Sequence, residues 1–74
     1  MAMVETKEIQ IVVNGEVRSV PAGRSVSELL AFLEVDPARV AVELNRSIVR
    51  RPQWRETLVG QGATLEIVQF VGGG

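Results

Sequence analysis

The 74-residue chain closes with LEIVQFVGGG, residues 65–74, and this stretch decides the fold. From Leu65 to Val71, every residue except Glu66 and Gln69 is apolar, which predicts a β-strand. A strand with this many apolar residues is typical of the middle of a sheet, where other elements cover much of both faces of the strand. We therefore expect residues 65–71 to form a central strand that the three glycines follow directly.

The N-terminal part of the chain predicts a hairpin. Residues 9–13 alternate in the manner of a strand, with Ile9, Ile11 and Val13 on one side. Asn14-Gly15 follows, and both residues tolerate the positive φ of a type I′ turn. Residues 16–20 then form the return strand, which ends at Pro21 because proline has no N–H to donate. A central last strand would pair beside the first strand, in parallel, since the long crossover allows it.

Ser25 and Glu28 form a capping box, in which each side chain accepts a hydrogen bond from the backbone of the other residue. The box predicts a helix over residues 25–34. The spacing of its apolar residues gives one stripe that must lie on another element, and Phe32 is outside that stripe. The stripe consists of Val26, Leu29, Leu30 and Leu33.

The remaining segments predict a third strand over residues 40–44, a turn at Asn45-Arg46 and a short strand at Ile48-Val49. Trp54 is expected to cover an edge of the sheet as part of the core. The expected fold class is α+β: a mixed sheet of four or five strands with one main helix packed across it. The domain is expected to span residues 8–71, with a flexible leader at 1–7 and a flexible glycine tail at 72–74.

Composition restricts the chemistry of the side chains. The chain has no cysteine and no histidine, which excludes a disulfide framework, a thiolate metal site, a thiol nucleophile and the usual general base. We expect no catalytic residue, no metal site and no bound cofactor. The net charge of −1 provides no attraction to nucleic acid or to an anionic membrane. With no secretory signal and no long apolar run, the expected location is the cytoplasm.

The glycine run is the most informative feature for function. Residues 71–74 can extend to ~13 Å, and without Cβ atoms the glycines can enter a channel too narrow for other residues. The carboxylate of Gly74 is ionised at neutral pH and is a poor electrophile. A partner would have to activate it, for instance by adenylation, before a nucleophile could attack the carbonyl carbon. A flexible end without function is the alternative interpretation.

These residues together resemble the small sulfur carrier proteins of the ubiquitin-like β-grasp fold, most closely the carriers of thiamin biosynthesis. The resemblance covers residues 9–74, and two positions depart from it: Arg50 stands where relatives usually have proline, and Ala63 where they usually have an acidic residue. The matching motifs are Val13-Asn14-Gly15-Glu16, Ser25-Val26-Ser27-Glu28-Leu29-Leu30, Val42-Glu43-Leu44-Asn45, Ile48-Val49, Gln53-Trp54 and Glu66 to Gly74.

The resemblance implies a protein cosubstrate rather than an enzyme. An E1-like adenylating enzyme would use ATP to activate Gly74, and a persulfide-bearing protein would supply sulfur to form a thiocarboxylate. Thiazole synthase would then take the sulfur for the thiazole ring of thiamin, while Gly72 and Gly73 thread into the partner. The alternatives are a small subunit of molybdopterin synthase, a ubiquitin-like modifier conjugated to lysines, and a plain interaction domain.

Two groups of residues are candidates for docking to a partner. Val68 and Phe70 fall on the strand face opposite Leu65, and together with Val71 they would form an apolar patch. Arg50 and Arg51 belong to a cluster, with Arg46 and Arg55, that would attract an acidic surface if it is more than a solvated rim. Nothing in the spacing of Glu43 and Glu66 forces the two carboxylates together, so we interpret them as ordinary strand-surface residues.

Overall fold

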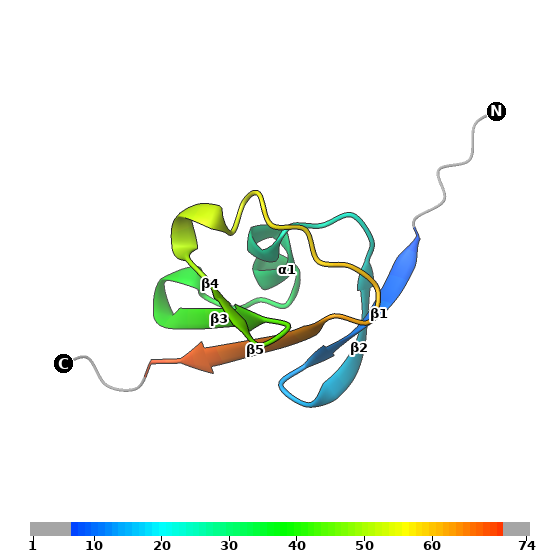
Figure 1. Cartoon of the computed structure of the whole chain (residues 1–74), viewed down its shortest axis with the longest axis horizontal. Coiled ribbons are helices and arrows are strands. Elements are labelled where there is room, and N and C mark those ends of the chain that lie inside the picture. The colour runs from blue at the N-terminus through cyan, green and yellow to red at the C-terminus, as the bar shows by residue number, and fades with distance from the viewer. Residues whose placement is uncertain (1–6, 71–74) are drawn as a thin grey trace.

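The computed structural model describes residues 7–70, in which a five-stranded sheet packs against one α-helix (Figure 1). Residues 1–6 of the predicted leader (1–7) lie outside the described residues, as do Val71 and the predicted tail at 72–74. No helix in the described part is long and apolar enough to cross a membrane. The elements are β1 (Glu8–Val13), β2 (Glu16–Pro21), α1 (Val26–Phe32), η1 (Pro37–Arg39), β3 (Val40–Leu44), β4 (Ser47–Val49), η2 (Arg51–Gln53) and β5 (Thr64–Gln69).

The sheet has the strand order β2-β1-β5-β3-β4, so the prediction of a central last strand is confirmed. β5 pairs in parallel with β1, where Val12 is opposite Thr64, and antiparallel with β3, where Val42 is opposite Ile67. The strand is shorter than expected, because its ladder ends at Gln69 and not at residue 71. Phe70 keeps one backbone bond beyond the ladder, since its N–H donates to the carbonyl oxygen of Arg39 at 2.8 Å.

The expectation that both faces of β5 are covered is wrong. Leu65 is fully buried against the core, whereas Val68 is 55% exposed on the other face. The physical reason is that α1 packs against one face of the sheet, and no other element of residues 7–70 lies over the opposite face (Figure 1). The apolar composition of β5 therefore reflects a core face and an exposed apolar face.

Both hairpins use two-residue turns with positive φ. Asn14 and Gly15 have φ of 50° and 85°, and Val13 opposite Glu16 closes the ladder of β1 and β2. Asn45 and Arg46 have φ of 51° and 71° between β3 and β4. These angles suit the type I′ geometry, whose twist matches that of the flanking strands. Both predicted turns are confirmed, and Arg46 adopts its left-handed conformation against the preference of a side chain with Cβ.

The predicted capping box starts α1 as expected. The Ser25 hydroxyl accepts from the N–H of Glu28 at 3.1 Å, and the Glu28 carboxylate accepts from the N–H of Ser25 at 2.9 Å. The hydrogen bond from the Ser25 backbone lowers the pKa of the Glu28 carboxyl, with the Arg24 guanidinium adding to the effect. Val26, Leu29 and Leu30 are buried as predicted, and Phe32 is exposed.

The C-terminus of α1 comes earlier than the predicted boundary at residue 34. Glu34 has a φ of 61°, and its N–H donates to the carbonyl of Ala31 at 3.1 Å. The N–H of Val35 donates to the carbonyl of Leu30 at 2.9 Å, which completes a Schellman motif. Because glycine usually occupies the left-handed position of this motif, a glutamate there concealed the helix end in the sequence.

Trp54 belongs to the core, as expected. Its side chain is 4% exposed, and its indole N–H donates to the carbonyl oxygen of Val49 at 2.7 Å. This bond satisfies the one polar atom of the buried ring and ties the segment after η2 to the edge strand β4. The buried apolar residues that pack together are Ile11, Val13, Val20, Val26, Leu29, Leu30, Val40, Val42, Val49, Trp54, Val59, Ala63 and Leu65.

Replacement of Glu34 by glycine is expected to stabilise the protein. Glycine adopts the left-handed conformation without steric cost, so Glu34→Gly should raise the free energy of unfolding by about 0.5–1 kcal/mol despite its greater unfolded-state entropy. Urea denaturation of Glu34→Gly and Glu34→Ala measures the effect, and the alanine variant controls for loss of the carboxylate. A glycine variant no more stable than the alanine variant would contradict this account of the helix end.

The capping box also predicts a pH dependence of stability. Because folding lowers the pKa of Glu28, its contribution is complete above the unfolded-state pKa and is lost as the pH falls through the folded-state pKa. Glu28→Gln removes this titration, so its free energy of unfolding should fall less steeply with acidification. Glu56→Gln, an exposed glutamate outside the capping box, serves as the control. Equal acid slopes for wild type and Glu28→Gln would refute the prediction.

Candidate functional site

The candidate site is the C-terminal end of β5, where the described chain stops at Phe70. Gly72, Gly73 and Gly74, the predicted tail and sulfur-carrying residues, lie outside the described residues, as does Val71. The C-terminal end of β5 points away from the rest of the fold (Figure 1). It lies at one end of the molecule, and the start of β1 lies at the other. Gln69 is opposite Val40 at the start of β3, so η1 and the beginning of β3 adjoin the point from which residues 71–74 continue.

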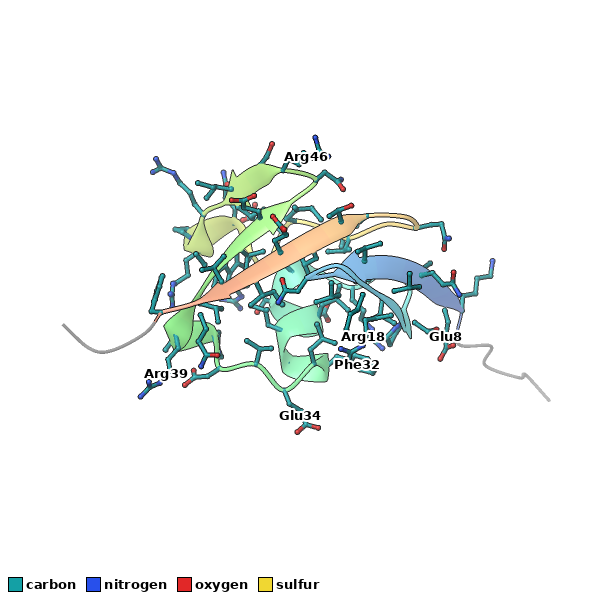
Figure 2. The ribbon with its side chains drawn as sticks, turned by 90° about the horizontal axis from the view of Figure 1, so that it is seen from below. Glu8, Arg18, Phe32, Glu34, Arg39 and Arg46 are labelled. Carbon is teal, nitrogen blue, oxygen red and sulfur yellow. The ribbon has the colours of Figure 1, made fainter. Side chains whose placement is uncertain are left out.

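We call the sheet surface turned away from α1 the outer face; it carries Ala41, Glu43, Ile48, Glu66, Val68 and Phe70. Figure 2 looks onto this face, with β5 crossing in front of α1. Val68 and Phe70 are 55% and 56% exposed, on the side predicted for them, and Ile48 is exposed as well. Exposed apolar side chains so close to the end of β5 suit contact with another protein.

Glu43 and Glu66 lie directly opposite each other on the outer face, a closeness that sequence spacing did not predict. Like charges at opposed positions of neighbouring strands destabilise a sheet. Neither carboxylate belongs to the ion pairs within residues 7–70, which join Arg24 to Glu28 and Arg39 to Asp36. The described residues contain no group of three or more metal-binding side chains, so the pair is not part of such a cluster.

The two docking arginines lie at the β4 edge of the sheet. Val49 is opposite Val42, which in turn is opposite Ile67, and Arg50 follows Val49. Two strand spacings, about 10 Å, therefore separate the backbone next to Arg50 from β5. Arg51 begins η2, and its guanidinium lies over the Trp54 ring, 5.0 Å from the centroid. The structure thus places the Arg50 backbone two strands away from β5, while Arg51 makes a cation–π contact with Trp54.

A shallow pocket of about 220 Å³ lies beside β5 on the helix side of the sheet. Its volume is below the range of typical small-molecule sites, which begin at roughly 300 Å³. The pocket is lined by Val13, Asn14, Arg18, Leu33, Val35, Val40, Ile67 and Gln69.

Sequence reasoning did not identify one polar contact near the end of β5. The side-chain amide of Asn14 bonds to the backbone of Ile67, 53 residues away. The role of Asn14 in the turn is sufficient to explain an asparagine at this position, so the local sequence did not indicate its contact with Ile67. An asparagine that ends a strand beside a predicted longer strand is the feature that could have indicated it.

Comparison with known proteins identifies the family. The model of the ThiS family matches residues 7–74. The Escherichia coli sulfur carrier protein ThiS is 35% identical over 66 residues, which cover 89% of this chain and 100% of that protein. The crystal structure of thiamine biosynthesis protein ThiS from Geobacter metallireducens superimposes with a TM-score of 0.77 at 36% identity and covers 89% of this chain and 100% of that one.

Longer proteins also contain a similar segment. Thiazole synthase from Paramagnetospirillum magneticum is 44% identical over 66 residues, which cover 89% of this chain and 20% of that protein. Thiazole synthase from Magnetococcus marinus is 35% identical with the same coverage. The chain therefore spans about a fifth of the length of these two relatives.

The five-stranded mixed sheet with one helix is a ubiquitin-like β-grasp fold, as predicted, and the Geobacter metallireducens structure shares it. The family match includes the glycine run at residues 72–74, which the structure does not describe. Since the match extends over nearly the whole chain and the Escherichia coli relative is matched over its full length, this chain belongs to the ThiS family.

Proposed function

We propose that this protein is a sulfur carrier in thiamin biosynthesis and that the carboxyl group of Gly74 is its reacting group. The observation that carries the proposal is the extent of the family match, which runs from residue 7 through Gly74. The Escherichia coli sulfur carrier protein aligns with the chain over its entire length. The absence of cysteine from the sequence agrees with a carrier that holds sulfur on a carbonyl carbon and not on a thiol.

The first step is activation of the carboxylate by an E1-like adenylating enzyme. A carboxylate oxygen of Gly74 attacks the α-phosphorus of ATP, pyrophosphate leaves, and an acyl adenylate forms. This step is needed because a carboxylate is a poor electrophile, whereas the mixed anhydride has a good leaving group. The described residues offer no histidine or cysteine for catalysis, so the catalytic groups are assigned to the enzyme and the carrier acts as a cosubstrate.

The second step transfers sulfur. The terminal sulfur of a protein persulfide attacks the carbonyl carbon of Gly74, AMP leaves, and an acyl disulfide forms. A thiol then reduces that disulfide, which releases the thiocarboxylate and leaves a disulfide on the donor side. Thiazole synthase receives the sulfur, and support for this partner comes from two thiazole synthases that contain a segment similar to this chain.

The outer face is proposed to dock the carrier on its partners. Val68 and Phe70 provide exposed apolar area next to the point where residues 71–74 continue, and Val71 would extend that area. Arg50 and Arg51 would speed encounter with an acidic partner surface more than they would tighten the final complex. The folded domain would thus determine which partner binds, and the glycine tail would carry the reacting carbon to it.

The chemistry is tested by intact mass spectrometry of the full chain. Incubation with the adenylating enzyme, ATP and a persulfide donor should replace one oxygen by one sulfur, confined to the C-terminal peptide. Omission of ATP should abolish the exchange, and a variant lacking Gly74 should not support growth of a strain that requires thiamin. Sulfur transfer to another peptide, or growth with the truncated variant, would refute the proposal.

The partner is tested separately by co-purification. Recovery of thiazole synthase with the carrier supports the thiamin pathway, whereas recovery of a molybdopterin synthase large subunit would refute that assignment. Isopeptide-linked adducts on cellular lysines would instead indicate a protein modifier.

The docking surface predicts a selective kinetic effect. Phe70→Ala should raise the KM of the adenylating enzyme for the carrier about tenfold, because truncation of an exposed aromatic anchor commonly costs 1–2 kcal/mol or more of binding energy. Leu58→Ala is the matched control, since Leu58 is 66% exposed and pairs with Ser25 at the start of α1, so it is not one of the outer-face residues. Equal KM values for the two variants would contradict docking through the outer face.

A further inference from the structure

β5 extends past the end of its pairing with β1. The parallel ladder of β1 and β5 consists of Val12 opposite Thr64 and Val13 opposite Leu65. At Asn14 the chain turns away into the first hairpin loop, with a φ of 50°. On the β3 side, pairing continues as far as Val40 opposite Gln69. The end of β5 that leads to the tail therefore has a regular strand partner on one side only.

The side chain of Asn14 replaces the missing strand. The backbone N–H of Asn14 donates to the carbonyl oxygen of Leu65 at 2.9 Å. In a regular parallel ladder, the carbonyl of the same residue would accept from the N–H of Ile67. In this protein Oδ1 of Asn14 accepts that bond at 2.8 Å, and Nδ2 donates to the carbonyl oxygen of Ile67 at 3.2 Å. One side-chain amide thus satisfies both backbone groups of Ile67.

Asn45 makes a related contact at the other end of β5. Its backbone N–H donates to the carbonyl oxygen of Thr64 at 2.7 Å, and its Oδ1 accepts from the N–H of Thr64 at 2.9 Å. Asn45 has a φ of 51°, so it occupies the same turn position as Asn14. The two asparagines bind different parts of β5. Asn45 binds Thr64, the first residue of the strand, whereas Asn14 binds Ile67, three residues before Phe70.

We propose that Asn14 is a positioning residue for the sulfur-carrying tail: its amide fixes the end of β5 and so sets the direction from which residues 71–74 enter a partner enzyme. The proposal rests on the proposed function of Gly74. Glycines offer no side-chain contacts, so the orientation of the tail must come from the strand that precedes it. If β5 occupies its productive direction only part of the time, the apparent affinity for the adenylating enzyme falls by that fraction.

The test compares Asn14→Gly with Asn45→Gly. Both variants keep a residue that tolerates positive φ and both lose a side-chain contact to β5. Amide hydrogen exchange followed by NMR reports on the strand in the isolated protein. Pyrophosphate release by the adenylating enzyme with ATP, at varied carrier concentration, gives KM and kcat. Asn14→Asp is a second variant that keeps an acceptor for the Ile67 N–H but loses the donor to the Ile67 carbonyl.

Asn14→Gly should speed exchange of the Ile67 amide about tenfold, the loss expected for one hydrogen bond of ordinary strength. Its KM should rise about three- to tenfold with kcat within about twofold of wild type, because only the population of the productive orientation changes. Asn14→Asp should fall between Asn14→Gly and wild type. Asn45→Gly should speed exchange at Thr64 and leave KM unchanged.

An equal KM for Asn14→Gly and Asn45→Gly would overturn the positioning role, as would unchanged exchange at Ile67. Absence of pyrophosphate release with the wild-type carrier would refute the proposed function itself, and the positioning role would fall with it. Release from wild type together with equal KM values for the two glycine variants would refute the positioning role alone.

Discussion

The fold depends on the hydrogen bonding of β5 on both of its sides. The strand lies in the centre of the sheet and buries Leu65, yet it must also deliver the C-terminal end of the domain to the surface. A central strand with an unpaired backbone would leave polar groups without partners. The fold meets both requirements with a short parallel ladder to β1, a longer antiparallel ladder to β3, and two asparagine side chains that complete the pairing.

Asparagine is well suited to these two positions for a double reason. It tolerates the positive φ of a type I′ turn, and its amide carries the same donor and acceptor as a peptide group. When the backbone carbonyl of Asn14 or Asn45 turns away into the loop, Oδ1 accepts the bond that the carbonyl would have accepted in a continued strand. Aspartate keeps the acceptor but loses the donor, and glycine keeps the turn but loses both.

The outer face follows from having one α-helix for one sheet. Because α1 covers only the inner face, Val68 and Phe70 remain exposed and Glu43 and Glu66 oppose each other without an ion-pair partner in residues 7–70. In the proposed function this face recognises a partner while the reacting carbon lies at Gly74. The division agrees with a chain that has neither cysteine nor histidine.

Much of this protein could be predicted from its sequence, because several of its features depend on residues a few positions apart. The Ser25–Glu28 capping box, the Asn14-Gly15 turn and the apolar alternation are of this kind, and the parallel placement of β5 beside β1 followed from connection rules.

Other features arise only from packing between distant segments. The bond from Asn14 to Ile67 spans 53 residues, and the opposition of Glu43 and Glu66 depends on the register of β3 and β5. The end of α1 at Phe32, before the predicted boundary, involves a glutamate at a position where glycine is usual, and the uncovered outer face depends on how the single helix packs on the sheet. Local patterns determine which elements form, whereas register and coverage are decided by the tertiary structure, since they minimise the free energy of the whole core and not of any one segment.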